Sequence, residues 1–579
     1  MKKKIIRREL KETASIDHTL HPILQRIYQA RGITSLTELD HALEKLLPYH
    51  NLLGIEKAVQ YLAAALSHQK KMLIVGDFDA DGATSTAVAI RALKSFGAQH
   101  IHYLVPNRFA FGYGLTPELV AVAIKEFNPD VIITVDNGIA NHAGVIAAKE
   151  NNITVIITDH HLPAETLPPA DVIVNPNQHG DFFPSKNMAG VGVIFYVMLA
   201  LRRHLTETQW FSVNNIPEPN MSKLLDIVAL GTVADVVPLD YNNRIMVHQG
   251  LRRIRADQCI PGIKALFAIA NRDHRKIVAS DLGFIVAPRL NAAGRLDDMS
   301  LGIECLLCDD HAKARAMATT LNQLNDERRI IEQDMQESAM TVLEKFKPNQ
   351  QKTLPHGVCL FDETWHQGVI GIVAARIKDR LHRPVIAFAR AANDVEIKGS
   401  ARSIPGFHIR DALASIATQH PQMIEKFGGH AMAAGLTLKR EYFEKFSEIF
   451  NAVVSQKIRE EDLSHKLMTD GELASNELSL EIAEKLREAG PWGQAFPEPL
   501  FDGVFTIIDQ RLVGSKHLKM LLSKEGKTID AIAFNVDLNQ WPNYRCHDVN
   551  VAYRMDINEY RGKRSVQMIV EYMESKDNS

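Results

Sequence analysis

Three carboxylates directly follow a short, strongly apolar run near residue 75. The run Met72-Leu73-Ile74-Val75 predicts a buried strand, and Asp77, Asp79 and Asp81 come immediately after it. Acids that lie this close repel one another, so a cation is needed to offset the repulsion. Hard ions such as Mg²⁺ and Mn²⁺, which prefer oxygen ligands, do this best. A solvated, aspartate-rich turn is the alternative interpretation.

The same pattern of apolar run and polar turn occurs twice more. Residues 131–135 lead into Asp136, and residues 153–158 lead into Asp159-His160-His161. Near-continuous β-branched runs are typical of strands buried on both faces of a parallel sheet. Helical patterns at 83–96 and 140–151 separate the three runs. Open α/β sheets bind ligands beyond the carboxyl ends of their strands, so all three polar turns are expected in one crevice.

A fourth acid completes a predicted two-metal centre. Asp235 follows an apolar helical stretch at residues 224–230. Two ions about 3.5–4 Å apart can activate water and stabilise an in-line phosphoryl displacement. We expect Asp136 to bridge the ions and His161 to stabilise charge on the reacting phosphate. Asp159 is either a ligand or a partner that orients a ligand histidine. The remaining predicted ligands are Asp77 and Asp79 for one ion, and Asp81, His160 and Asp235 for the other.

These motifs resemble those of the DHH phosphoesterase superfamily. The resemblance starts at Asp77-Phe-Asp-Ala-Asp-Gly82, Val135-Asp-Asn-Gly138 and Asp159-His-His161. It continues at Pro288-Arg-Leu-Asn-Ala-Ala-Gly-Arg295, Gly399-Ser-Ala-Arg-Ser403 and Gly428-Gly-His-Ala-Met-Ala-Ala-Gly435, the last similar to the glycine-rich motif of the DHHA1 domain. It implies a 5′→3′ exonuclease that uses Mn²⁺ or Mg²⁺ and releases 5′-mononucleotides from single-stranded DNA in repair and recombination. It also implies a helicase and a single-stranded-DNA-binding protein as partners.

Five regions are expected along the chain, in an α/β fold. Residues 309–346 are charged and lack Gly and Pro, which predicts the longest helix of the protein. Short strand-like runs at 504–508, 518–522, 529–534, 549–555 and 566–571 are typical of an OB-fold. We predict a helical lead-in (1–49), a parallel-sheet DHH catalytic domain (50–300), a long connector helix (301–349), a smaller α/β DHHA1 domain (350–460) and a C-terminal OB-fold β-barrel (461–579).

Several residues outside the acidic turns suit contacts with DNA. Ser400 and Arg402 lie two apart on an extended segment, so they face the same side and can grip a phosphate. The aromatic loop that contains Arg108 and Tyr113 can stack on bases, or its phenylalanines pack in the core. The full set of candidates is Arg108, Tyr113, Arg289, Arg295, Ser400, Arg402, Gly429 and His430. Arg289 and Arg295 bracket residues 290–294, which we expect to form a small-residue loop. For the glycines, tight packing is the alternative. A basic set near the C-terminus, Arg511, Lys516, Lys519, Lys524, Arg561, Lys563 and Arg564, follows the DNA path or forms a solvated face.

Composition sets the remaining limits. With 66 Lys+Arg against 69 Asp+Glu, the net charge of −3 neither supports nor excludes DNA as a partner. Five scattered cysteines predict a reducing cytoplasm rather than a disulfide framework. The sequence has no apolar run long enough for a membrane span and no P-loop, so we expect neither a membrane nor a nucleotide cofactor. Nothing resembles a coiled coil, and we expect a monomer.

Two other functions stay open at this point. One is a phosphoesterase of the same superfamily that acts on short oligonucleotides, cyclic dinucleotides or pyrophosphate. The long connector helix and the predicted OB-fold argue against it, because a small substrate needs neither. The other is a non-catalytic nucleic-acid-binding scaffold, and the complete set of acidic and histidine residues argues against that.

Overall fold

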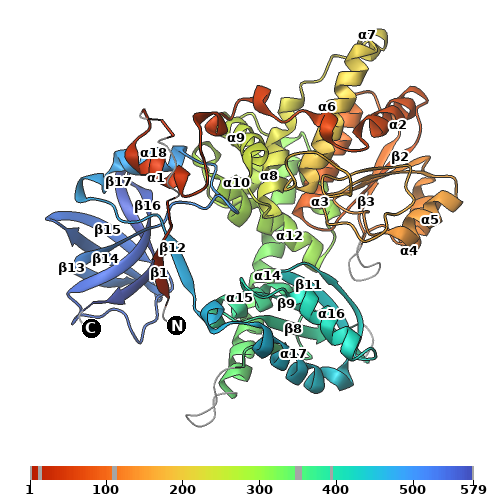
Figure 1. The fold of residues 1–579 in the computed structure, drawn as a ribbon. Helices are drawn as coiled ribbons and strands as arrows, with labels where there is room; N and C mark the ends of the chain where they lie inside the picture. The colour runs from red at the N-terminus through yellow and green to blue at the C-terminus, as the bar shows by residue number, and fades with distance from the viewer. Residues whose placement is uncertain are drawn as a thin grey trace. The chain divides into compact units, whose positions relative to one another are not determined.

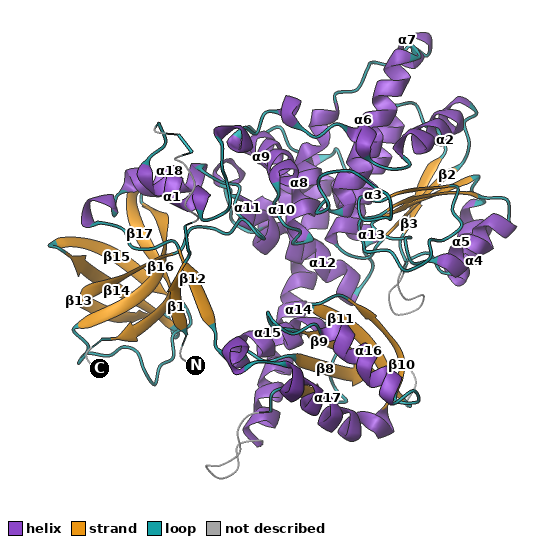
Figure 2. Ribbon diagram, viewed as in Figure 1, coloured by secondary structure: helices purple, strands orange, loops and turns teal. Residues whose placement is uncertain are grey.

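The computed structural model describes residues 3–10, 16–17, 19–106, 114–345, 355–391 and 395–576. Its internal contacts divide the chain into two units. One is Met1–Arg7 with Asp326–Met468, and the other is Arg8–Asn325 with Thr469–Ser579. Figures 1 and 2 show the helices and strands of both units. Within the described residues, no helix is long and apolar enough to cross a membrane.

A five-stranded parallel sheet forms the centre of the larger unit. Its order is β3-β2-β4-β5-β6, and every pair is parallel. The strands are β2 (Met72–Gly76), β3 (Ile101–Leu104), β4 (Val131–Val135), β5 (Thr154–Thr158) and β6 (Val172–Val174). The three predicted runs are the three central strands, β2, β4 and β5. The two short edge strands, β3 and β6, were not predicted, because runs of three or four residues carry little periodic signal.

Helices cover both faces of this sheet, which explains the continuous apolar runs. Ile74 and Ile133 pack into one core with helices α2 (Ile55–Ser67), α3 (Ala80–Ser95) and α6 (Gly190–Glu207). Their neighbours Leu73 and Ile132 point the other way, into a second core with helices α4 (Pro117–Phe127) and α5 (His142–Glu150). Alternate residues of a strand face opposite sides, so a strand buried on both sides is apolar at nearly every position.

A set of helices continues the larger unit after α6. Helix α8 is almost fully buried, consistent with its uniformly apolar sequence. The helices are α7 (Trp210–Val213), α8 (Leu225–Ala234), α9 (Tyr241–Arg255), α10 (Pro261–Ile269), α11 (Ala279–Asp281), a π-helix (Leu282–Val286), α12 (Ala287–Leu296) and α13 (Ser300–Leu307). The predicted connector is a single helix of 35 residues, α14 (His311–Lys345).

The C-terminal part of the same unit is a closed five-stranded barrel. Its order is β13-β14-β15-β17-β16, with β15 and β17 parallel and the other described pairs antiparallel. The strands are β13 (Phe501–Val513), β14 (His517–Lys524), β15 (Lys527–Ala533), β16 (Asp548–Tyr560) and β17 (Lys563–Ser575). Helices α1 (Pro22–Gln29) and α18 (Leu480–Glu488) share its core. The predicted OB-fold architecture is confirmed, although three strands extend beyond their apolar centres.

The smaller unit contains a mixed sheet in the order β10-β11-β9-β8-β7. Its strands are β7 (Val358–Phe361), β8 (Val385–Arg390), β9 (Glu396–Arg402), β10 (Ile424–Gly429) and β11 (Ala433–Lys439). Helices α15 (Ile370–Leu381), α16 (Ile409–Gln419) and α17 (Phe443–Lys457) accompany them. Only β7 and β8 pair in parallel. A short ribbon of β1 (Lys4–Arg7) and β12 (Lys466–Thr469) completes the strands.

A buried ion pair joins the lead-in to the start of the barrel region. Both side chains of Arg31 and Asp470 are 1% exposed, and they form two hydrogen bonds of 2.8 and 3.0 Å. The same guanidinium also donates to the carbonyls of Ile27 and Pro497 and lies 5.2 Å from the Trp492 ring centroid. Arg31 therefore joins segments about 440 residues apart in sequence. The Tyr28 hydroxyl and the Arg26 guanidinium add hydrogen bonds to the Ala489 and Glu472 carbonyls.

Replacing Arg31 tests this joint. Arg31→Ala leaves the buried Asp470 carboxylate with only Arg8, whose Nε lies 3.7 Å from Asp470 Oδ1, so the free energy of unfolding should fall by about 3 kcal/mol, measured by urea denaturation. Arg203→Ala serves as the control, because Arg203 pairs with Glu207 on the surface, and it should have little effect. Equal effects of the two variants would contradict a special role for the buried pair.

A pair of half-buried histidines predicts an acid-sensitive contact between the lead-in and α9. The rings of His41 and His248 lie 4.7 Å apart. Burial, together with each other's charge or nearby arginines, lowers the pKa of each to about 4. The fold favours their neutral forms, so their contribution is complete above about pH 6.5 and is lost as the pH falls towards 4. His248→Gln should therefore weaken the fall of the melting temperature between pH 7 and 4.5. An unchanged slope would contradict this assignment.

Candidate metal centre

The first acidic turn is shaped by the start of helix α3. Asp79 caps that helix, and its Oδ1 accepts hydrogen bonds from the backbone amides of Asp81 and Gly82 at 2.9 and 3.1 Å. Asp81 is 1% exposed and accepts from the amides of Gly190 and Val191 at 2.6 and 2.9 Å. The amino end of α6 thus partly offsets one buried negative charge.

A second carboxylate meets the first through an unusual backbone. Asp136 at the end of β4 is 2% exposed and has a left-handed conformation, with φ of 61°. A Cβ atom at Gly190 would lie only 2.6 Å from the Asp136 Cβ atom, so only glycine allows α6 to start this close. The two carboxylates are therefore packed against the same helix end.

His160 lies at the centre of three carboxylates. Its Nε2 atom is 3.1 Å from Asp136 Oδ1, 3.5 Å from Asp235 Oδ2 and 4.0 Å from Asp81 Oδ2. Burial, and then the neighbouring His161, lower the pKa of His160 and favour the neutral imidazole that metals bind. Among the described residues, this buried nitrogen has no hydrogen-bond partner. A cation is the natural occupant of such a point.

Asp159 and His161 form a separate ion pair beside the cluster. Asp159 is buried, and its Oδ1 lies 2.7 Å from His161 Nδ1. Burial opposes both charges, but their attraction and hydrogen bond prevail. They lower the pKa of Asp159 to about 2 and raise the pKa of His161 to about 9. The Asp159 carboxylate therefore favours the protonated imidazole of His161 and orients it.

The carboxylates of Asp81, Asp136 and Asp235 repel one another, and that of Asp235 is only partly buried. Burial, followed by neighbouring charges, raises the pKa of Asp81 to about 7 and that of Asp235 to about 8. The same causes raise the pKa of Asp136 well above its usual value. Bound cations would reverse this by stabilising the ionised forms. These oxygen and nitrogen donors suit Mn²⁺ or Mg²⁺.

The donors form three groups in which all ligand atoms lie within 4.8 Å of one another. The groups are Asp77, Asp79 and Asp136; Asp81, His160 and Asp235; and Asp136, His160 and His161. Asp136 belongs to the first group, and its Oδ1 also lies 3.1 Å from His160 Nε2 of the second, which suits a carboxylate shared by two ions. The first two groups divide the residues as the sequence analysis does, so these residues fit the predicted pair of divalent cations.

The predicted DNA-binding residues of the larger unit differ in their exposure and contacts. Arg108 and Tyr113 lie outside the described residues. Arg289 is 7% exposed and donates to the Ile285 carbonyl at 2.6 Å and to Asn322 Oδ1 at 3.0 Å, so its guanidinium is engaged within the fold. Arg295, on the same helix, is partly exposed.

The segment between these arginines is a helix, not the small-residue loop expected from the sequence. In α12, Asn291 Oδ1 accepts from the Ala80 amide at 2.8 Å. A Cβ atom at Gly294 would lie 1.9 Å from the Phe78 carbonyl oxygen. The small residues of this motif therefore let α12 pack against the first acidic turn.

The other four predicted DNA-binding residues lie in the smaller unit. Ser400 and Arg402 share one face of β9, with Arg402 Nη1 3.1 Å from Ser400 Oγ. Both face Gly371 of α15, where a Cβ atom would lie 2.9–3.0 Å from them. Gly429 has φ of 135° and turns the chain before the exposed His430. Ser400 of β9 pairs with Gly435 of β11, so the motif at residues 399–403 and the glycine-rich motif at residues 428–435 lie side by side in the sheet.

Comparison with known proteins decides the family. Family models match at three places: "DHH family, N-terminal domain" over residues 71–232, "DHHA1 domain" over 354–456 and "RecJ OB domain" over 469–572. The single-stranded-DNA-specific exonuclease RecJ of Escherichia coli is 53% identical over 98% of both chains, and that of Haemophilus influenzae is 51% identical over both full lengths. The chain belongs to the RecJ family. The predicted DHH and DHHA1 resemblance is thereby confirmed.

Solved structures of RecJ proteins agree with this fold. A crystal structure of Thermus thermophilus RecJ in complex with Mn²⁺ has a TM-score of 0.80 at 30% identity, and covers 99% of this chain and 79% of that one. A further structure, of an exonuclease RecJ bound to manganese, has a TM-score of 0.58 at 33% identity and covers 72% of this chain and all of that one. RecJ relatives with this architecture therefore bind manganese.

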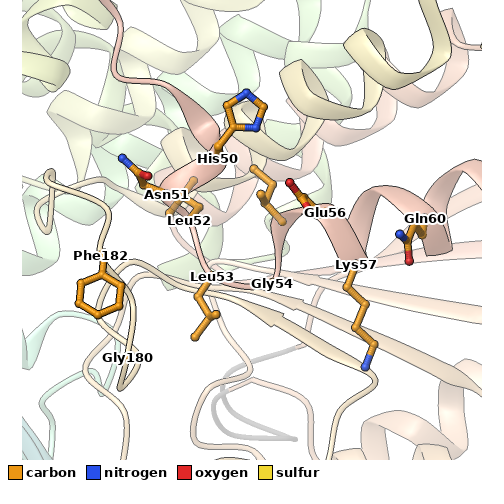
Figure 3. A pocket seen from close by; sticks show the side chains of 11 residues that line it. His50, Asn51, Leu52, Leu53, Gly54, Glu56, Lys57, Gln60, Gly180 and Phe182 are labelled. Carbon is orange, nitrogen blue, oxygen red and sulfur yellow. The ribbon is translucent and has the colours of Figure 1, made fainter. Parts of the chain in front are cut away.

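A pocket of about 540 Å³ lies apart from the predicted site residues. Figure 3 shows its lining around the start of α2, including Lys57 and the strongly exposed Phe182. None of the predicted metal-binding or DNA-binding residues lines this pocket. Its side chains include no cluster of the acidic and histidine type found at the sheet edge.

Sequence patterns did not indicate the strained residue beside Asp235. Helix α8 ends at Ala234, Asp235 is its C-cap, and Val236 comes next. Val236 is 63% exposed and has φ of 61°. Glycine is the common residue at this position of a helix end, since a left-handed backbone crowds any side chain and a β-branched one most of all. The sequence shows a valine where a helix end usually has glycine, but only the backbone angle of Val236 reveals the strain.

Val236→Gly tests the strain at this helix end. The substitution should raise the free energy of unfolding by about 1 kcal/mol, because relief of about 1–2 kcal/mol outweighs glycine's larger unfolded-state entropy. Val213→Gly is a matched control on α7, at an exposed helical valine, and should lower stability. Thermal melting of the two variants distinguishes them, and a destabilised Val236→Gly protein would argue against strain.

Proposed function

We propose that this chain is a metal-dependent exonuclease that degrades single-stranded DNA from its 5′ end to 5′-mononucleotides. The observation that carries the proposal is the convergence of Asp81, Asp136 and Asp235 on His160 in a chain of the RecJ family. The proposed metal ligands are Asp77, Asp79, Asp81, Asp136, His160 and Asp235. Two divalent cations, Mn²⁺ or Mg²⁺, would polarise the phosphodiester and lower the pKa of a bound water.

His161 contributes a positive charge of the chain's own. The Asp159 carboxylate keeps its imidazole protonated and fixes its direction. An imidazolium at this point can donate a hydrogen bond to a phosphate oxygen as negative charge develops on it. Asp159 thus acts through His161, and in our proposal it is not a metal ligand.

The smaller unit supplies a proposed grip for the 5′ end. Ser400 Oγ and the Arg402 guanidinium share one face of β9, and a hydroxyl beside a guanidinium suits a phosphate. His430 follows on the adjoining hairpin, whose turn depends on Gly429. Holding a terminal phosphate would let the enzyme admit an end rather than an internal segment, and this sets polarity. Arg295, Arg108 and Tyr113 complete the proposed contacts.

Basic residues of the barrel suit the rest of the strand. OB-folds bind single strands along their second and third strands and the loops beside them. Arg561 and Lys563 lie at the turn between β16 and β17, and Lys516 lies between β13 and β14. Lys519, Lys524 and Arg564 are ion-paired with Asp530, Glu472 and Glu484 and are less suited. Of the predicted basic set, we therefore favour the loop residues together with Arg511, which is exposed on β13.

The proposed setting is the bacterial cytoplasm, where DNA is repaired and recombined. The degraded strand would be opened by a helicase and coated by a single-stranded-DNA-binding protein. We propose both as partners, and a monomer as the active form.

The direct test is digestion of a single-stranded oligonucleotide labelled at its 3′ end, with Mn²⁺ or Mg²⁺. Products should shorten from the 5′ end, and neither a blunt duplex nor a reaction with EDTA should give them. Intact oligonucleotide combined with rapid hydrolysis of dinucleotides or pyrophosphate would favour the small-substrate phosphoesterase instead.

Asp136→Asn tests the shared ligand. Asparagine tolerates the left-handed backbone, so the variant should fold, bind the oligonucleotide and lose hydrolysis by at least about 100-fold. Asp130→Asn is the control, since Asp130 is exposed at the amino end of the same strand. Wild-type cleavage by Asp136→Asn would refute the metal assignment, and lost DNA binding would place Asp136 in substrate binding.

A further inference from the structure

The segment that follows β6 reaches back to the two histidines. Asn175 comes directly after β6 and is fully buried, and Asn177 is partly buried two residues later. β6 is the edge strand beside β5, and β5 ends at Thr158, directly before Asp159. Two asparagine side chains thus lie next to the turn that carries His160 and His161.

Each asparagine donates to one histidine carbonyl. Asn175 Nδ2 donates to the His161 carbonyl oxygen at 2.9 Å, and Asn177 Nδ2 donates to the His160 carbonyl oxygen at 2.6 Å. The two asparagines are also joined to each other, because the Asn177 amide donates to Asn175 Oδ1 at 2.7 Å. The pair therefore acts as one rigid element with two donors.

These hydrogen bonds fix the orientation of peptide groups that strand pairing does not reach. Beyond the end of β5, the sheet no longer orients the peptide planes, and a carbonyl there needs another donor. Fixing the carbonyls of His160 and His161 fixes the peptide planes that follow both residues, and with them the directions of both side chains. His160 must point at Asp136, whereas His161 must point at Asp159.

We propose that Asn175 and Asn177 are positioning residues that hold His160 and His161 in the directions needed for metal binding and turnover. The inference rests on the proposed function, because it assigns the asparagines to the same metal site. They touch neither the proposed ions nor the substrate, and they act only through the histidine backbone. Removing partners of this kind typically weakens metal affinity or activity by about 10- to 100-fold.

Gln178 offers a matched control in the same segment. It is 6% exposed, and its Nε2 donates to the carbonyls of Leu53 and Ile173 at 3.1 Å each. It makes two backbone hydrogen bonds, as the asparagine pair does, but neither goes to a histidine. Gln178→Ala therefore reports what loss of ordinary bonding in this segment does.

The experiment compares the full-length wild type with Asn177→Ala, Asn175→Ala and Gln178→Ala. Mn²⁺ affinity is measured from the electron paramagnetic resonance signal of free Mn²⁺, kcat and KM on the 3′-labelled oligonucleotide, and stability by thermal melting. We expect Asn177→Ala to lose about 10- to 100-fold in Mn²⁺ affinity and in kcat with little change in KM. Gln178→Ala should melt earlier but keep wild-type Mn²⁺ affinity. Asn177, being only partly buried, gives the decisive variant if Asn175→Ala does not fold.

The outcomes separate this inference from the proposed function. Wild-type Mn²⁺ affinity and kcat in Asn177→Ala would overturn the inference and leave the proposed function standing. An equal loss of affinity in Gln178→Ala would also overturn it, since the segment's general stability would then be responsible. A wild-type protein that binds no Mn²⁺ would refute the metal site and the inference together.

Discussion

Repulsion among buried carboxylates is the constraint on which this structure depends. Asp81, Asp136 and Asp235 approach a single imidazole, and their pKa values are all raised. A fold holds like charges together only if other groups offset the cost. Two backbone amides at the amino end of α6 offset part of the negative charge of Asp81. Bound cations would offset the remaining negative charge of the cluster. The glycine at the start of α6 permits this close approach, and α12 packs against the first acidic turn.

The two histidines of the third motif divide the work between them. They are adjacent in sequence, yet burial and His161 lower the pKa of His160 while Asp159 raises the pKa of His161. Neutral imidazole suits a ligand, and imidazolium suits a phosphate. The division requires both side-chain directions to be fixed independently. In our proposal, the asparagines after β6 provide this, and the edge strand that presents them becomes part of the site.

The fold was predictable where long apolar runs met polar turns. The central strands β2, β4 and β5 and the five barrel strands all have such runs, and the 35-residue helix α14 has no helix breaker. The short edge strands β3 and β6 have too few residues for any period, and the helix α12 was taken for a loop because of its glycine and alanines. Small residues indicate close approach, but they do not say whether a helix or a loop makes it.

Sequence alone determined which residues meet at the candidate metal centre, because acids and histidines at the ends of parallel strands must meet at one edge of the sheet. It also determined the family, through motifs whose spacing few other chains share. Tertiary structure decided the roles within that set. Only the folded chain reveals that Asp159 is committed to His161, that Arg289 is bound to the Ile285 carbonyl and Asn322, and that Asn175 and Asn177 reach the histidine carbonyls. Such roles depend on partners from distant segments, and no local pattern records which partner a side chain finds.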